Sequence, residues 1–191
     1  MIATDRVLLV SSTIKGAELL QEMLADMTGE LVSAQSGAQA RRELLEGEYS
    51  LVVINTPLSD EFGHDLAADA AVNTAAGVVM LVKAELCDEV ADRIESQGVF
   101  CVAKPMMRAS LMRTVRQALA SHTRLNALLM QKRALERRFE QQRLTDRAKF
   151  VLMERAGMTE SQAHRYLLKQ AMDLRTTKES VASQVLAHYE V

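Results

Sequence analysis

Basic residues and one tyrosine are interleaved near the end of the chain, at positions that the apolar pattern leaves on the outside of short helices. Lysine and arginine neutralise phosphates, and an aromatic ring can stack on an unpaired base, so this combination can bind nucleic acid. The same cations would also fit a merely solvated helix face, and the tyrosine could instead complete a core. The residues are Lys149, Arg165, Tyr166, Lys169, Arg175 and Lys178. The hydroxyls of Thr176 and Thr177 could add contacts, although helix capping explains one of them.

The charge of the chain is divided unevenly along its length. The net charge is −2, but residues 1–107 carry 7 Lys and Arg against 17 Asp and Glu, whereas residues 108–191 carry 16 against 8. A basic half of this kind suggests a polyanionic partner, because each phosphate that is neutralised releases counterions.

Short apolar runs alternate with helical stretches from Arg6 onward. Aliphatic and β-branched runs are typical of strands that helices cover on both faces. They predict an α/β domain with a doubly wound, five-stranded parallel sheet in the flavodoxin-like order 2-1-3-4-5, whose crevice lies at the carboxyl ends of the first and third strands. The predicted strands are 7–10, 31–32, 51–54, 78–82 and 99–102, and the predicted helices are 19–27, 38–45, 65–72 and 84–97.

Two segments follow predicted strands: Asn55 to Gly63 follows the third strand, and Lys104-Pro105 follows the fifth. On these segments the predicted domain of residues 1–120 resembles the CheY-like receiver domains of response regulators, and the resemblance covers about residues 5–120. It implies a crevice in which two acidic residues and an aspartate bind Mg²⁺ and accept a phosphoryl group.

The crevice positions depart from that pattern. Ser11 and Ser12 stand where the two acidic residues would be, and Asn55 replaces the phosphoacceptor aspartate. Val82 replaces the threonine-like hydroxyl, so only Lys104 is retained. Because Mg²⁺ and phosphoryl transfer both need carboxylates here, we expect a degenerate receiver that is not phosphorylated by the usual route. We hypothesise that Lys104 hydrogen-bonds to Asn55 or to the serines.

A long helix is predicted to link the two halves, since no glycine or proline occurs between Met106 and Arg155. Apolar or small residues recur in residues 111–146 at the spacings of a heptad seam, and exposed apolar stripes usually mark interfaces. We expect a homodimer through a parallel or antiparallel coiled coil, with packing against the receiver-like domain as the alternative. The seam is Leu111, Val115, Ala118, His122, Leu125 and Leu129; beyond Lys132, the residues Leu135, Phe139 and Leu144 continue it out of step.

Residues 147–191 are predicted to form an all-α, three-helix domain. Gly157 ends the incoming helix, Thr159 and Gln162 form a capping box for a helix that runs to about Leu174, and Thr176 with Glu179 repeats that signature. A small core can close at helical spacing, and Met172 is expected to pack. The core positions are Val151, Leu152, Ala163, Leu167, Ala171, Leu174, Val181, Val185 and Leu186.

Several residues of this segment keep a recognisable order and spacing: Ala148-Lys149, Leu152-Met153 followed by Gly157, Ala163 with Tyr166-Leu167, and the segment from Ala171 to Arg175. On these residues the domain resembles the ANTAR domain, the RNA-binding module of bacterial transcription antitermination regulators. The resemblance implies binding to paired small hairpins in nascent messenger RNA, which prevents the terminator from forming. Two hairpins would suit a dimer.

Other readings stay open at this point. Three-helix cores also occur in helix-turn-helix DNA readers, and the chain could be a protein-interaction module. If phosphorylation provides no input, control could come from a sequestering partner protein, a ligand in the crevice, or abundance. An enzyme is disfavoured, and we expect no catalytic residue, metal or cofactor, because the histidines lack metal-ligand spacing and no nucleophile motif or glycine-rich phosphate loop occurs. The histidines are His64, His122, His164 and His188.

The cysteines, the acidic residues after the third strand and the hydropathy of the chain each lead to a further expectation. Cys87 and Cys101 lack ligand-like spacing and are expected to be buried thiols. The acidic Asp60, Glu61 and Asp65 are expected to form a solvated face. No run is long enough to span a bilayer and no signal peptide is evident, so a cytoplasmic location is expected.

Overall fold

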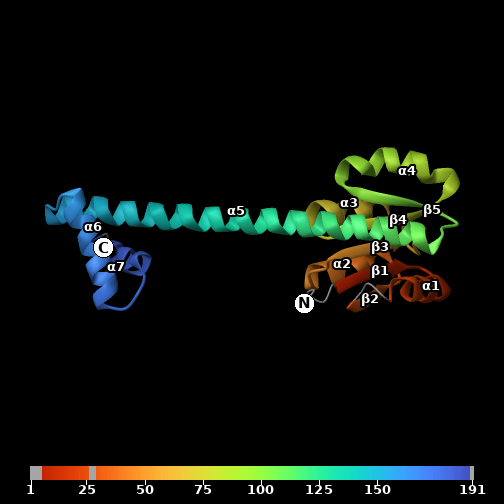
Figure 1. The fold of residues 1–191 in the computed structure, drawn as a ribbon, viewed down its shortest axis with the longest axis horizontal. Coiled ribbons are helices and arrows are strands. Elements are labelled where there is room, and N and C mark those ends of the chain that lie inside the picture. The colour runs from red at the N-terminus through yellow and green to blue at the C-terminus, as the bar shows by residue number, and fades with distance from the viewer. Residues whose placement is uncertain (1–5, 26–28, 190–191) are drawn as a thin grey trace. The chain divides into compact units, whose positions relative to one another are not determined.

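The computed structural model describes residues 6–25 and 29–189 (Figure 1). The chain divides into two compact units, a first unit formed by Met1–Ala127 and a three-helix unit formed by Leu128–Val191. Within the described ranges, no helix is both long enough and apolar enough to cross a lipid bilayer.

The first unit contains a five-stranded parallel sheet in the order β2-β1-β3-β4-β5, which confirms the predicted fold. In the register of the sheet, Ser11 lies beside Asn55, so the ends of β1 and β3 bring these polar side chains together. The strands are β1 (Arg6–Ser11), β2 (Glu30–Ala34), β3 (Leu51–Asn55), β4 (Gly77–Lys83) and β5 (Val99–Lys104).

Helices cover both faces of this sheet, which explains why its central strands are apolar on both sides. One core cluster joins the sheet to α2, α3 and α4, and the other joins it to α1 and α5. The helix predicted at 84–97 is instead α4 between two short 3₁₀ turns. The helices are α1 (Ile14–Leu24), α2 (Gly37–Glu46), α3 (His64–Asn73), η1 (Ala84–Leu86), α4 (Cys87–Ile94), η2 (Glu95–Gln97) and α5 (Arg108–Ala156).

The first helix begins at Ile14, earlier than predicted, because Thr13 caps it. The Thr13 hydroxyl accepts a hydrogen bond of 3.2 Å from the Gly16 backbone N–H. Met27, the predicted end of this helix, and the first residues of the chain lie outside the described residues.

The long helix α5 confirms the prediction of one continuous element from Arg108 to Ala156. Its first apolar positions, Leu111, Val115 and Ala118, are fully buried in the core cluster that they share with α1 and the sheet. The prediction that these three residues belong to a dimer seam is therefore wrong, and the alternative of packing on the receiver-like domain is correct for them. The same 3–4 spacing serves either role. His122 is also held within the first unit, with its Nδ1 2.7 Å from the Ala75 carbonyl oxygen.

The three-helix unit consists of the end of α5 together with α6 (Glu160–Asp173) and α7 (Lys178–Tyr189). The capping box of Thr159 and Gln162 is present as predicted. The cap of α7 differs from the prediction, because the Ser180 N–H donates to the hydroxyl of Thr177 at 3.2 Å and not to that of Thr176.

The core of the three-helix unit differs from the prediction in two places. Leu174 and Met172 are exposed, because the last turn of α6 carries them away from the core. The small residues Ala148 and Ala182 are fully buried instead, within the core cluster of this unit.

The two cysteines are not fully buried, contrary to expectation. Cys87 begins α4 and Cys101 lies on β5, and both are half-buried. Their sulfur atoms lie 3.5 Å apart, a proximity that the sequence spacing did not reveal.

Candidate functional site

The crevice at the carboxyl ends of β1 and β3 is closed by a chain of hydrogen bonds. The Asn55 amide donates to the Ser11 hydroxyl at 3.1 Å, and Lys104 Nζ donates to Asn55 Oδ1 at 3.0 Å and to the Thr56 carbonyl oxygen. The hypothesis that Lys104 hydrogen-bonds to Asn55 is therefore confirmed.

The start of α1 lies directly against this chain of hydrogen bonds. A methyl group placed on Gly16 would come within 2.7 Å of Asn55 Nδ2 and 3.0 Å of the Ser11 hydroxyl oxygen. Only glycine permits such a close approach of the helix backbone. The crevice is thus occupied by the protein's own polar groups, which offer an amide and hydroxyls but no carboxylate.

Two of the predicted crevice residues do not join this cluster. The Ser12 hydroxyl donates to the Pro57 carbonyl oxygen at 2.9 Å, and Val82 is fully buried in the core beneath α2, α3 and α4. Lys104 is the remaining cation of the crevice, and burial together with the nearby positive charge of Lys83 lowers its pKa.

The acidic residues after β3 have structural partners, so the expected solvated face is incomplete. Asp60 is exposed but accepts hydrogen bonds of 2.8 and 2.9 Å from the backbone N–H groups of Gly37 and Ala38 at the start of α2. These two hydrogen bonds lower its pKa. The prediction is wrong for Glu61, which is half-buried in a two-pronged ion pair with Arg41 at 2.8 and 3.1 Å. Asp65 is exposed, as expected.

Lys149 is not an outward-facing cation, contrary to the prediction. Its side chain is only 15% exposed, and its Nζ lies 2.7 Å from Asp146 Oδ1 and 3.4 Å from Glu160 Oε1. The hydrogen bond with Asp146 raises the pKa of Lys149 and lowers that of Asp146. Lys149 therefore ties α5 to the first residue of α6, and two carboxylates already neutralise it.

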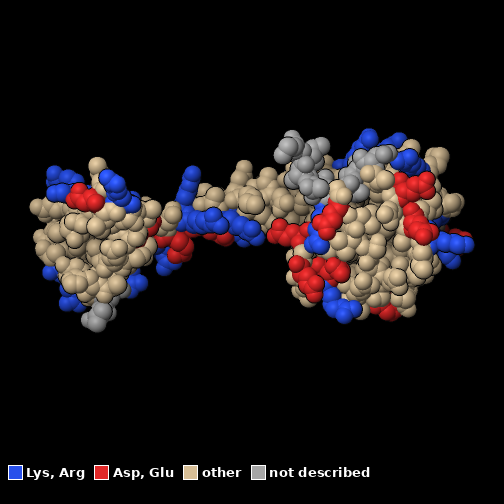
Figure 2. All heavy atoms as spheres, turned by 90° about the horizontal axis from the view of Figure 1, so that it is seen from below, with Lys and Arg blue, Asp and Glu red and all other residues tan. Residues whose placement is uncertain are grey.

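Of the cations that the sequence predicted to bind nucleic acid, the exposed ones lie on α6 and on the turn that follows it, and α5 carries further exposed cations such as Arg133 and Arg155. Arg165, Lys169 and Arg175 are exposed, whereas Lys178, the first residue of α7, is half-buried. On the face seen in Figure 2, Lys and Arg side chains spread over this unit, while Asp and Glu gather on the first unit.

Arg175 occupies an unusual backbone conformation. Its φ of 49° is left-handed, a region that normally favours glycine. The Thr176 N–H donates to the Ala171 carbonyl at 2.9 Å and the Arg175 N–H to the Met172 carbonyl at 3.2 Å, the two hydrogen bonds of a Schellman motif that ends α6. A non-glycine residue at such a strained position is a reason to look for a function.

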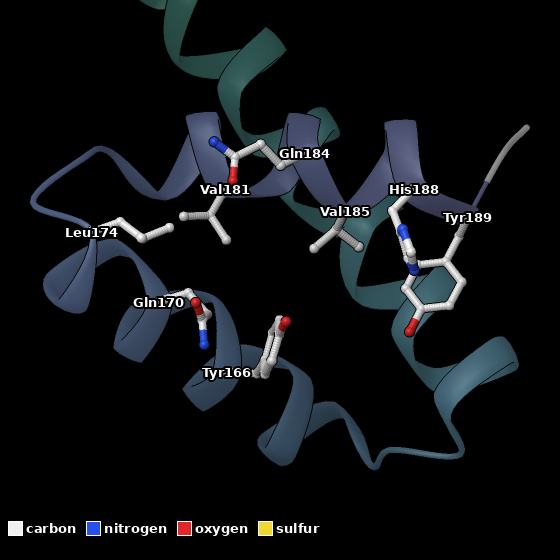
Figure 3. A pocket seen from close by; sticks show the side chains of 8 residues that line it. All are labelled: Tyr166, Gln170, Leu174, Val181, Gln184, Val185, His188 and Tyr189. Carbon is white, nitrogen blue, oxygen red and sulfur yellow. The ribbon is translucent and has the colours of Figure 1, made fainter.

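Tyr166 stands at the edge of a pocket of about 210 Å³ between α6 and α7 (Figure 3). Its side chain is 37% exposed and is not part of the buried core cluster, so the alternative of a core tyrosine is wrong. The pocket is lined by Tyr166, Gln170, Leu174, Val181, Gln184, Val185, His188 and Tyr189.

The sequence prediction named Tyr166 but missed the other polar and aromatic residues of this pocket, which are Gln170, Gln184, His188 and Tyr189. Gln170 follows Tyr166 by four residues, and His188 follows Gln184 by four, so each pair shares one face of its helix. The four-residue spacing could have predicted that each pair shares a helix face. It could not predict that these faces of α6 and α7 lie against each other, because that depends on how the three helices pack.

Comparisons with known proteins agree with both halves of this description. The chain matches the ANTAR domain family over residues 133–186. It is also 30% identical over 168 residues to the transcriptional regulatory protein PdtaR of two Mycobacterium tuberculosis strains, CDC 1551 and H37Rv, a match that covers 87% of this chain and 82% of the relative.

Solved structures match the receiver fold. The signal receiver domain of an HD-domain-containing protein from Pseudomonas fluorescens Pf-5 superposes with a TM-score of 0.60 at 22% identity, over 66% of this chain and 96% of that one. The receiver domain of a putative LuxO repressor protein from Vibrio parahaemolyticus gives 0.59 at 19% identity, over 66% and 98%. The match to the mycobacterial regulator extends across both units, and the chain therefore belongs to the ANTAR-domain response regulators, with a receiver-like domain ahead of the ANTAR domain.

Proposed function

We propose that this protein is a transcription antitermination regulator that binds hairpin RNA in nascent leader transcripts through its ANTAR domain. The observation that carries the proposal is the ANTAR match over residues 133–186, which includes the unit where exposed Arg165, Lys169 and Arg175 accompany Tyr166. Cations can hold the phosphates of a hairpin loop while an aromatic ring stacks on an unpaired base. Lys149 is left out of this interface because Asp146 and Glu160 already bind it.

The receiver-like domain works in this proposal without phosphorylation. Asn55 supplies an amide where a carboxylate nucleophile is needed, and it is hydrogen-bonded on both sides to Ser11 and Lys104. Control then comes from a partner protein, from a ligand, or from the amount of the protein in the cell.

A homodimer would present two ANTAR domains to a pair of hairpins. Its seam begins later on α5 than the sequence suggested, because Leu111, Val115 and Ala118 are buried in the first unit. The predicted seam residues Leu125 and Leu129 stay part of the proposal, since Leu125 is exposed and Leu129 is half-buried. Leu128, Leu135 and Phe139 extend the apolar stripe, and all three are exposed, Leu135 by 64% and Phe139 by 68%. A coiled coil through these residues would remove this apolar surface from water.

Binding to a two-hairpin leader RNA, taken from upstream of the neighbouring genes, tests the proposal. The full-length protein is titrated across a salt series without phosphodonor, beside a DNA duplex of equal length. We expect RNA-selective binding that weakens as salt rises, because cations of the protein displace counterions from phosphates. Equal affinity for the duplex would favour a DNA-binding regulator, and no binding at low salt to either would favour a protein-interaction module.

A further inference from the structure

Two thiols of the first unit lie next to each other, although their positions in the sequence are 14 residues apart. Cys87 begins α4, Cys101 lies within β5 beside it (Figure 1), and their Sγ atoms are 3.5 Å apart. A disulfide bond is about 2.05 Å long, so the two sulfur atoms need to approach by only about 1.5 Å to form one. Rotation of two short side chains together with a small shift of α4 supplies a movement of this size.

The packing of α4 turns Cys87 toward the sheet. Val90 and Ile94 follow Cys87 by three and seven residues, the spacing of one helix face, and both are buried. Cys101 pairs with Met80 in the register of the sheet, and both pack in the core cluster to which Val90 and Ile94 also belong. The two sulfur atoms therefore meet where α4 covers the edge strand of the sheet, and buried neighbours hold each of them in place.

The exposure of the pair suits a reactive site better than a structural one. Cys87 and Cys101 are both half-buried, so a small reagent has access to them, whereas a cysteine sealed in a core is inert. In a reducing compartment, a disulfide between two such thiols forms transiently and responds to the redox state.

We infer that Cys87 and Cys101 are a redox modification site, at which exchange with a low-molecular-weight disulfide forms a reversible intramolecular disulfide. The thiolate of one cysteine attacks a sulfur atom of the small disulfide, whose S–S bond breaks and releases one small thiolate. The second cysteine then attacks the protein sulfur of this mixed disulfide and releases the other small thiolate. The two cysteines give up two electrons and two protons, and the small disulfide is reduced to two thiols.

The new bond ties α4 to the strand that carries Lys104 and leads into α5. It closes the chain segment 87–101 into a loop, which restricts the unfolded chain, and the oxidised first unit is therefore more stable than the reduced one. This input needs no carboxylate at position 55, so it is open to a receiver-like domain in which Asn55 replaces the phosphoacceptor. The inference goes beyond the proposed RNA binding and does not depend on it.

Equilibration of the full-length protein with mixtures of reduced and oxidised glutathione tests the site. Samples are quenched with acid, alkylated and measured by intact mass spectrometry, which separates the reduced protein, its glutathione adducts and the intramolecular disulfide. We expect the equilibrium constant for the intramolecular disulfide to be at least about tenfold larger in the folded protein than in urea, because the fold already holds the two sulfur atoms together. Thermal unfolding should show a higher melting temperature for the oxidised first unit, and peptide mapping should place the bond between residues 87 and 101.

The variants Cys87→Ser and Cys101→Ser are the matched controls, because each keeps one thiol and should form a glutathione adduct but no intramolecular bond. Circular dichroism checks that both variants keep their helical content. If one of them fails to fold, the comparison of wild type in buffer and in urea still decides. An equilibrium constant no larger in the folded protein than in urea would overturn the inference. Stable glutathione adducts on both cysteines of the folded wild type, or a disulfide only between two copies of the chain, would overturn it as well.

Discussion

Lys104 donates a hydrogen bond of 3.0 Å to the side-chain oxygen of Asn55, and the same amide reaches Ser11 through its nitrogen at 3.1 Å. Three positions that a working receiver uses for metal and phosphate are thus bound to one another. The first unit keeps the receiver fold while its crevice is filled by its own side chains.

Acetyl phosphate with Mg²⁺ is expected not to phosphorylate the protein. The variant Asn55→Asp should also stay unlabelled, because Ser11 and Ser12 still provide no carboxylate for the metal. Intact mass spectrometry and a phosphate-affinity gel measure the labelling, with an active receiver protein as the positive control. Strong labelling of Asn55→Asp would contradict the reading of the crevice as closed to phosphoryl chemistry.

Removing the charge of Lys83 should stabilise the first unit. The pKa of Lys104 is lower in the folded protein than in the unfolded chain. At pH values between these two pKa values, the unfolded chain binds more protons than the folded protein, so the free energy of unfolding rises with pH across this range. Lys83→Gln removes the repulsion between the positive charges of Lys83 and Lys104. We expect the free energy of unfolding at pH 7 to increase by less than about 1 kcal/mol, and this increase should shrink once Lys104 loses its proton. Urea unfolding at neutral and alkaline pH measures it. Lys15→Gln, at another exposed lysine, serves as control, and an equal gain there would refute the assignment.

Two substitutions at Arg175 should separate backbone strain from RNA binding. Arg175→Gly removes the penalty that a Cβ suffers at a φ of 49°, whereas Arg175→Ala keeps it. We expect the glycine variant to be the more stable of the two by about 1 kcal/mol in thermal unfolding. Both should bind leader RNA more weakly than the wild type, since both lose the guanidinium. Wild-type affinity in both variants would remove Arg175 from the interface.

Lys149 and Lys169 should behave in opposite ways when each is changed to alanine. Lys149→Ala breaks the link to Asp146 and Glu160 and should lower the melting temperature of the three-helix unit at neutral pH. Lys169→Ala changes an exposed side chain and should leave stability within about 0.5 kcal/mol while weakening RNA binding. Circular dichroism melts measure the stability of each variant, and RNA titrations on the same samples measure its affinity. A stable Lys149→Ala variant with a selective loss of RNA affinity would reverse the assignment.

Charge placed on the exposed stripe of α5 should dissociate the proposed dimer. Leu135→Glu and Phe139→Glu put like charges opposite each other in a coiled coil, so light scattering should report the monomer mass. Arg137→Glu introduces the same charge two residues away, on another side of the helix, and should stay dimeric. A wild type that is monomeric at high concentration would exclude the seam.

Much of the fold could be predicted because single elements carry their own signal. The buried runs of β1, β3 and β4 are apolar on both faces, and Thr159 with Gln162 marks the start of α6 through local hydrogen bonds. The absence of glycine and proline was enough to predict α5. The identity of residue 55, asparagine and not aspartate, was also enough to predict that the phosphoacceptor carboxylate is absent.

The functional surfaces could be predicted less well because they depend on contacts between elements. Leu111 has the spacing of a dimer seam, but the same spacing buries it on the sheet. From the sequence alone, Lys149 was predicted to be a free cation. In the structure, Asp146 of α5 and Glu160 at the start of α6 lie within ion-pair distance of it. The two glutamines of the α6–α7 pocket carry no motif, and only the packing of the helices places them together.

The neutral acceptors around Lys104 also change what the first unit demands of its surroundings. By resemblance, a working receiver crowds three carboxylates into its crevice, where like charges repel one another until a divalent cation arrives. Here Lys104 donates to the Asn55 side-chain oxygen and to the Thr56 carbonyl oxygen, and the Asn55 amide nitrogen donates to the Ser11 hydroxyl. These neutral partners of the lysine do not repel one another. If these neutral hydrogen bonds replace the charge balance that magnesium provides in a working receiver, the stability of the first unit is expected not to depend on the magnesium concentration.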